Sequence, residues 1–197
     1  KVYKMSSSAT PYGARPVGTL SASGSFTGKV RHYGIASGYG TDIFYGDFVK
    51  LVAAGTVEKD TGTTTLTPVG IFLGVSYTDP NTSQKTFAQY YPASTAASDI
   101  QAYVLDDPNV LFEMQADGSA AVTNIGNNVA VVQTAGSTSI GTSKNAIDIS
   151  TAATTTATLP VRIVDISPKS DNAAGDSFTD LVAKFNAGHI MDNTTGI

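Results

Sequence analysis

Hydrophobic and polar residues alternate in short runs along most of the chain, and glycine, asparagine, aspartate and proline separate these runs at a spacing of roughly ten residues. β-Branched and aromatic residues are frequent, and they favour strands because their side chains pack well on a pleated surface. Helix-forming stretches are scarce. The pattern predicts an all-β protein, built as a β-sandwich or a partly open β-barrel with long loops.

The strongest predicted strand covers residues 69–77, where apolar residues predominate. Its glycines allow another backbone or a bulky side chain to approach closely. Residues 110–115 alternate well, with Val110, Phe112 and Met114 on one face, and we expect Phe112 in the core. Further strands are expected at residues 47–52, 56–59, 87–91, 100–105, 129–133 and 159–166.

One segment near the C-terminus supports two interpretations. Phe178, Leu181, Val182 and Phe185 have the i, i+3, i+4, i+7 spacing of a helix stripe, and Ser177 could cap such a helix. The same stretch also alternates as a strand does. Local spacing alone favours the helix.

Residues 1–28 differ from the rest because serine, glycine and proline leave little to bury. We expect an extended N-terminal arm there, ordered only where something holds it. Residues 29–197 are expected to form the β-rich domain, either as one body or as two packed β subdomains that divide near residues 92–100. Residues 134–158, rich in small polar residues, are expected as long loops or a weakly held hairpin.

Composition narrows the classes of function. The chain has 197 residues, a net charge of −4 and no cysteine, so cysteine metal sites and thiol nucleophiles are excluded and a dedicated nucleic-acid binder is disfavoured. It contains no run of eighteen apolar residues, so no transmembrane helix is expected. Only 14% of residues are charged, well below the usual quarter or so, and such a weakly charged surface suits packing against neighbours.

Candidate chemistry is sparse. His32 and His189 have no second histidine at ligand spacing, and no G-x-S-x-G motif marks a serine nucleophile. Asp106 and Asp107 precede a proline and are typical of a turn rather than a calcium loop. We therefore predict no catalytic residue, no cofactor and no metal ion.

Tyrosine is the residue type that best suggests binding, because it combines apolar area with a hydroxyl group. It is also an ordinary strand residue, so both interpretations stay open. Tyr3 and Tyr12 favour an interface, since the arm offers no core for them to fill. The candidate interaction interface consists of Tyr3, Tyr12, Arg15, Tyr33, Tyr39 and Tyr45.

Several stretches resemble a known family. Residues 45–51, 55–57 and 68–75 resemble the G-D-x-V-x-L, G-x-V and G-I-x-x-G-V pattern of tailed-bacteriophage capsid decoration proteins, also called cement proteins. Residues 102–115 are similar to structural proteins of marine and cyanobacterial phages, as are residues 159–166, 185–189 and 195–197 at the C-terminal end. The resemblance extends, with gaps, from residue 40 to the C-terminus.

This resemblance implies a strand at residues 181–186, which we therefore prefer to the helix. It also implies a virion protein on the outer surface of the expanded icosahedral head, which bridges major capsid subunits and resists the pressure of the packaged DNA. Such proteins are commonly oligomeric, and a homotrimer is favoured, with neither nucleic acid nor a membrane as a partner. The alternative is a receptor- or carbohydrate-binding module of a phage head or tail fibre, against which the absence of tryptophan argues.

Overall fold

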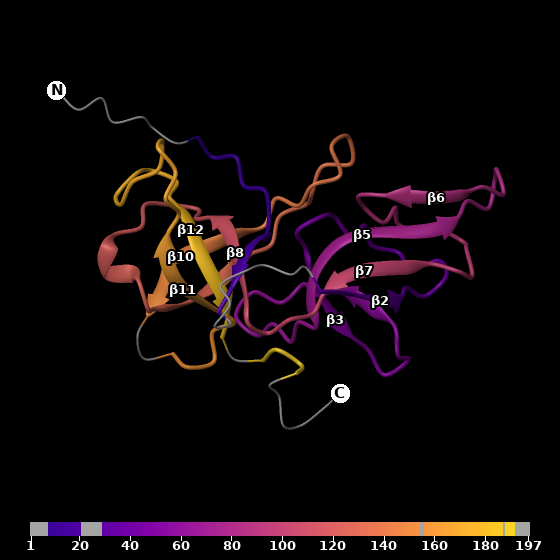
Figure 1. Cartoon of the computed structure of the whole chain (residues 1–197), viewed down its shortest axis with the longest axis horizontal. Coiled ribbons are helices and arrows are strands. Elements are labelled where there is room, and N and C mark those ends of the chain that lie inside the picture. Colours follow the sequence, from indigo (N-terminus) through magenta and orange to yellow (C-terminus); the bar gives the residue numbers. More distant parts are fainter. Residues whose placement is uncertain (1–7, 21–28, 154–155, 187, 192–197) are drawn as a thin grey trace.

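The computed structural model describes residues 8–20, 29–153, 156–186 and 188–191 (Figure 1). Their strands form two antiparallel sheets that pack together as a sandwich rather than as a closed barrel. The all-β prediction is confirmed. The one helical element among these residues is a single 3-10 turn, η1 (Val122–Asn124).

The first sheet, called the β8 sheet below, lies at the left of Figure 1. Its strand order is β1 (Arg15–Thr19), β8 (Val110–Gln115), β12 (Asp180–Phe185), β11 (Val161–Ile166), β9 (Asn128–Val132) and β10 (Ala146–Ala153). The β5 sheet lies at the right, in the order β2 (Val30–Gly34), β7 (Gln101–Leu105), β5 (Gly70–Thr78), β3 (Phe48–Leu51) and β4 (Val57–Lys59), with β6 (Lys85–Ala88) paired to the end of β5. The chain passes from the β5 sheet to the β8 sheet once between β7 and β8, at residues 106–109.

The main core lies between the sheets and is built around three phenylalanine rings. Phe48 comes from the β5 sheet, and Phe112 and Phe185 come from the β8 sheet. Their ring centroids lie 5.2 to 5.6 Å apart, a spacing typical of favourable edge-to-face and tilted pairs. The predicted burial of Phe112 is confirmed, because its side chain is fully buried.

The β5 sheet is apolar on both faces. The face away from the main core carries Val49, Phe72 and Val75, and it is covered by side chains of the connecting segments, among them Ile43 and Tyr91. Burial on both faces explains why residues 69–77 are apolar in nearly every position instead of alternating.

Most predicted strands are present to within two residues, and the exceptions have physical causes. The strand expected at 181–186 is confirmed as β12, and the helix that local spacing favoured there is wrong. Leu181, Ala183 and Phe185 all point into the core, which only the two-residue period of a strand allows. The strand expected at 87–91 is instead β6 at 85–88, with Phe87 exposed.

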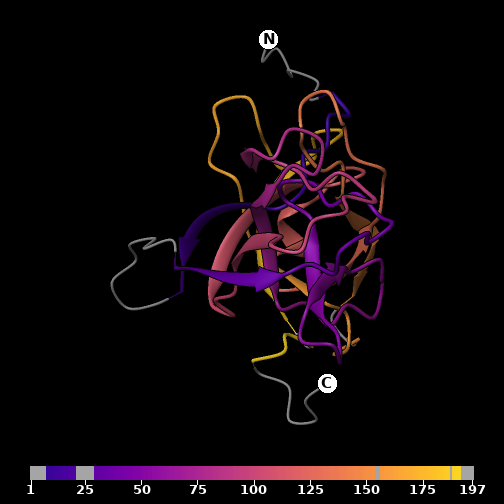
Figure 2. The same cartoon turned by 90° about the vertical axis from the view of Figure 1, so that its right-hand side faces the viewer.

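Three strands were not predicted: β1, β2 and β10. In β1 and β2, Pro16, Gly18, His32 and Gly34 interrupt any apolar pattern, and both strands are edge strands that pair on one side only. They lie on the same side of the molecule in Figure 2. The third strand, β10, pairs antiparallel with β9, which lies before residues 134–158, so residues 134–145 form a long loop and residues 146–153 form a strand.

The segment expected as an arm is held by the β8 sheet where it is described. β1 pairs antiparallel with β8, and Gly13 and Ala14 just before it are buried. Gly13 has a φ of +73°, and a β-carbon at this position would lie 2.5 Å from Ser143. Glycine is therefore required where this segment approaches Ser143. The remaining parts of the predicted arm, residues 1–7 and 21–28, lie outside the described residues.

Candidate interaction surface

The outer face of the β8 sheet carries more apolar side chains than a solvated sheet face needs. Along β8 and β12 the inward residues are buried, whereas Leu111 and Val182 point outward and are half-buried. Val17 lies at the bulge where the register of β1 against β8 shifts, and 50% of it is exposed. These residues place apolar side chains on three neighbouring strands, next to charged ones, because Glu113 lies opposite Val182 and Lys184 lies opposite Leu111.

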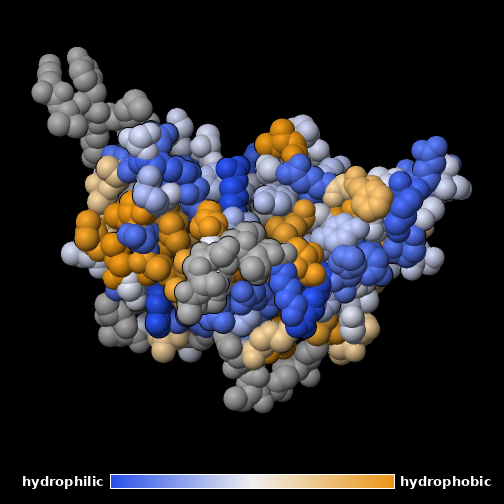
Figure 3. Space-filling model, in the orientation of Figure 1, coloured by the Kyte–Doolittle hydropathy of each residue, from blue (hydrophilic) through white to orange (hydrophobic). Residues whose placement is uncertain are grey.

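Further apolar side chains lie beyond β11, at η1 at the end of the molecule. Val122 and Ile125 of this turn are exposed, and the backbone N–H of Gly126 donates to Ile163 O on β11. Figure 3 shows hydrophobic surface gathered over β11, β12 and η1. The name apolar face is used below for this set: Val17, Leu111, Val122, Ile125, Val164 and Val182.

A groove of about 370 Å³ lies on the apolar face next to β1. Its walls include Val17, Pro168 and Val182, and the side chains of Glu113 and Lys169 line it as well. An apolar side chain of a partner could enter between these walls, and a polar group could reach the charged pair. The groove therefore provides apolar contact area for a binding partner, and its charged pair provides polar contacts that would orient the partner.

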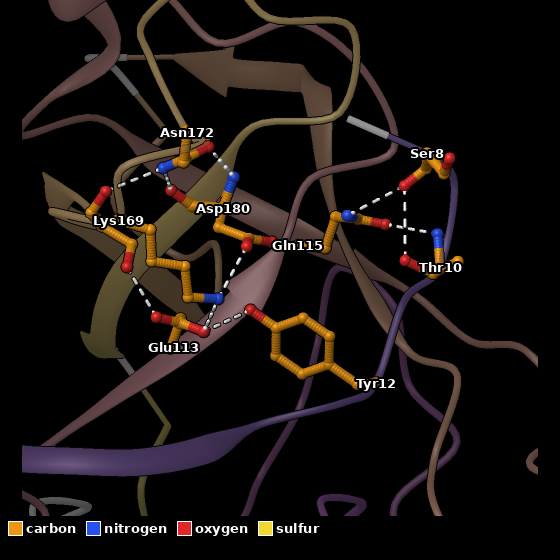
Figure 4. A network of polar contacts seen from close by, with 9 residues as sticks. Ser8, Thr10, Tyr12, Glu113, Gln115, Lys169, Asn172 and Asp180 are labelled. Atoms are coloured by element: carbon orange, nitrogen blue, oxygen red, sulfur yellow. Dashed lines mark hydrogen bonds and ion pairs between the residues drawn. The ribbon is translucent and has the colours of Figure 1, made fainter. Parts of the chain in front are cut away.

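Glu113 is the centre of a polar network beside the groove (Figure 4). The hydroxyls of Tyr12 and Ser167 each donate to its carboxylate at 2.6 Å, and Lys169 bridges it to Asp180, with Nζ 2.8 Å from Asp180 Oδ2. Burial alone would raise the pKa of Glu113, but the hydrogen bonds from Lys169, Ser167 and Tyr12 outweigh it and hold the pKa below its usual value. Glu113 is thus a buried, ionised residue that accepts hydrogen bonds from Tyr12, Ser167 and Lys169.

Tyr12 is fixed from both sides by this network. The Arg15 guanidinium lies 4.0 Å from its ring centroid, and its hydroxyl donates to Glu113. Burial, followed by the hydrogen bond to Glu113, raises the pKa of Tyr12 far above its ordinary value. Tyr12 therefore stays a neutral donor that ties the segment before β1 to the sheet.

The segment before Tyr12 is held by Gln115 of β8. Thr10 N donates to the side-chain oxygen of Gln115 at 2.8 Å, and the side-chain nitrogen of Gln115 donates to Ser8 O at 3.1 Å (Figure 4). These paired bonds extend the contact of the N-terminal segment with the sheet beyond β1.

The structure distributes the predicted interface tyrosines over two regions. Tyr12 and Arg15 lie beside the groove on the apolar face, whereas Tyr33, Tyr39 and Tyr45 lie with the β5 sheet. Tyr3 lies outside the described residues. The candidate set is therefore not brought together at one surface.

The tyrosines of the β5 sheet are engaged within the chain. The hydroxyl of Tyr33 donates to Asp106 at 2.9 Å, and that of Tyr39 accepts from Lys59 N at 3.2 Å. Tyr45 exchanges backbone hydrogen bonds with residues 141 and 143.

The members of the apolar face were missed by sequence reasoning. Val182 and Leu111 belong to strands whose other face is in the core. Their apolar side chains are therefore hard to distinguish, in the sequence alone, from those of a strand buried on both faces. Val122 and Ile125 lie in a turn, where no periodicity applies. The sequence did contain one clue: Val182 is an apolar residue at a position of the alternating strand where Asp180 and Lys184 are polar.

The histidines and acidic turns form no site within the described residues. His32 packs edge-on against Tyr103, and buried His189 accepts from Met191 N while its ring lies 4.9 Å from Phe185. No group of three or more metal-ligating side chains occurs in this part of the chain. Among the same residues no helix has the length and hydrophobicity needed to cross a membrane.

A second, more polar cleft of about 420 Å³ lies at the far end of β5. Tyr77, Asp79 and Asn81 line it on one side, and residues 92–96 line it on the other. Asp79 is used within its own turn, because its carboxylate accepts from the backbone of Asn81 at 2.7 Å. Asn81 is exposed in this cleft, whereas Tyr77 is buried, with only 8% of its surface exposed.

Comparison with protein-family models, curated protein sequences and solved structures finds no match to this chain.

Proposed function

We propose that this protein is a virion structural protein that binds the outer surface of an expanded icosahedral phage head, bridges major capsid subunits and stabilises the shell. The apolar face is the observation that carries the proposal, and the family resemblance supplies the class of partner. A surface where several exposed apolar side chains gather marks an interaction site. The low charge of the chain, 14%, reduces the desolvation cost of burying such a surface.

The energetics of a repeated lattice suit a modest binding face. Each Å² of apolar surface removed from water contributes about 25 cal/mol, so a few valine and isoleucine side chains give weak binding at one site. A homo-oligomer presents several such faces at once, and linked sites raise the effective affinity without new contacts. We therefore propose self-association together with binding to the major capsid protein, and the family resemblance favours a trimer.

Co-sedimentation with expanded, undecorated heads tests this function. Wild-type protein is expected to pellet with the heads at a fixed ratio to the major capsid protein. Val122→Lys and Val17→Lys place a charge on the apolar face at exposed positions, so they leave folding intact and abolish co-sedimentation. Phe87→Lys is the matched control, because Phe87 is 72% exposed but lies on the β5 sheet. Loss of binding in the control and retention in both apolar-face variants would assign the contact to another surface.

A receptor- or carbohydrate-binding module is the second candidate, and the polar cleft beside Tyr77 favours it. Sugar hydroxyls accept hydrogen bonds from amide groups and donate them to carboxylates, and Asn81 and Asp79 supply these two groups in the cleft. A glycan array tests the idea directly. Binding that is lost in Asn81→Ala would support the module, and an array without any ligand would exclude it.

A further inference from the structure

Four polar side chains are buried together where the β5 sheet meets the segment that leads into β10. Asp47 precedes β3, Lys59 ends β4, and Ser143 and Asn145 precede β10. Asp47, Ser143 and Asn145 are fully buried, and only 10% of the Lys59 side chain is exposed. A lysine and an asparagine from opposite sheets thus share one water-poor site.

The Asp47 carboxylate contacts both of these residues. Its Oδ2 lies 2.9 Å from Lys59 Nζ, and its Oδ1 accepts from Asn145 Nδ2 at 3.1 Å. Ser143 Oγ donates to Oδ1 at 2.6 Å and Phe44 N donates to Oδ2 at 2.9 Å, which fixes the carboxylate in place. One held carboxylate therefore lies next to both an amine and a side-chain amide.

The Asn145 amide is polarised on its other side. Thr134 N donates to Asn145 Oδ1 at 3.1 Å, so a backbone N–H stabilises negative charge on this oxygen. Attack on the amide carbon would develop negative charge at this atom. The arrangement therefore supplies a nucleophile, an electrophile with a hydrogen-bond donor on its oxygen, and a proton carrier between them.

We propose that Lys59 and Asn145 form an intramolecular amide bond, with Asp47 as the proton-transfer residue. Lys59 Nζ gives a proton to Asp47 and attacks Asn145 Cγ. The Nζ–Cγ bond forms and the Cγ–Nδ2 bond breaks. The two protons that Nζ loses pass through Asp47 to the leaving nitrogen, which departs as ammonium and leaves Asp47 ionised again. No oxidant, reductant or cofactor is required.

The fold provides the conditions that this reaction needs. Holding both groups on one carboxylate converts an intermolecular reaction into an intramolecular one, and exclusion of water strengthens the electrostatic interactions. The long, flexible stem of lysine lets Nζ move from Asp47 onto Asn145 Cγ. The Phe44 ring, whose centroid lies 5.8 Å from Nζ, covers the amine.

The bond would join the edge strand β4 of one sheet to the start of the edge strand β10 of the other. It would close a long loop of the chain and so restrict the unfolded state, as a disulfide does in proteins that have cysteine. This inference does not depend on the capsid function, because the contacts that carry it lie inside a single chain.

Intact-mass measurement of the purified full chain tests the proposal. Wild-type protein is expected to be lighter than its sequence by one ammonia molecule. Trypsin would not cleave after the acylated Lys59, so a branched peptide that contains residues 51–85 joined to residues 145–162 is expected. Lys59→Arg keeps the positive charge beside Asp47 but cannot form the bond, so it should have its full mass.

Lys50→Arg is the matched control, because Lys50 lies on β3 opposite Glu58 and should leave the ammonia loss unchanged. A wild-type chain with its full sequence mass would overturn the proposal. Ammonia loss with normal cleavage after Lys59 would also overturn it, because this result indicates a cyclic imide at an asparagine.

Discussion

Replacing Phe112 with alanine tests whether the two sheets are held together by the aromatic core. The Phe112 side chain is fully buried, and its ring centroid lies 5.6 Å from that of Phe48 and 5.2 Å from that of Phe185. Burial of the side chain contributes about 1.5–3 kcal/mol, and each aromatic pair adds about 0.5–1.5 kcal/mol. Phe112→Ala is therefore expected to lower the free energy of unfolding by about 3–5 kcal/mol, as large-to-small core changes do.

Urea unfolding followed by fluorescence or circular dichroism measures this loss. With an m-value of about 2 kcal/mol/M, the midpoint should fall by about 2 M. Phe87→Ala is the control, since Phe87 is exposed and its removal should change stability by no more than about 0.5 kcal/mol. A loss under about 1 kcal/mol for Phe112→Ala would refute the assignment of this ring to the inter-sheet core.

Three further predictions concern the polar network around Glu113 and the close approach of β5 to β7. The pKa of Glu113 is lowered in the folded state, so its ionised form contributes stability above its unfolded pKa of about 4.3, and this contribution is lost as the pH falls through the folded pKa. The difference in free energy of unfolding between wild type and Glu113→Gln should therefore shrink between pH 7 and pH 3. A constant difference would contradict the prediction. Tyr12→Phe removes the hydroxyl that donates to Glu113 and should cost about 1.5–3 kcal/mol in urea unfolding, whereas an unchanged midpoint would show that this bond is not formed. Gly70→Ala would bring a β-carbon within 2.1 Å of Leu105 O and should destabilise the protein by about 1–3 kcal/mol in thermal unfolding. Gly40→Ala is the control, because open space surrounds Gly40 and the change should be neutral. Equal melting temperatures for the two variants would refute the close approach of β5 and β7.

Alternation along the chain was enough to locate the strands that carry the core. β8 was predictable because Val110, Phe112 and Met114 occupy one face, and β5 because its apolar residues continue for most of its length. The edge strands β1 and β2 were not, since they pair on one side and tolerate Pro16 and Gly34. At β12, local spacing favoured a helix and the family resemblance a strand, and packing against β8 and β11 is the physical reason for the strand.

The polar contacts had no counterpart in the sequence. Glu113 and Lys169 lie far apart in the chain, and their pairing depends on β12 and the segment after β11 meeting β8. The contact of Asp47 with Asn145 likewise depends on the segment before β10 reaching the β5 sheet. Residue types at these positions are common in turns and strand ends, so nothing local distinguishes them from solvated residues.

Electron microscopy of expanded heads incubated with the purified protein tests the proposed function most directly. The account predicts added density on the outer surface, at one fixed class of position, with the apolar face of the β8 sheet turned toward the major capsid protein. A shell that stays bare at saturating protein, or protein bound through the β5 sheet with Val17 and Val122 facing solvent, would contradict it.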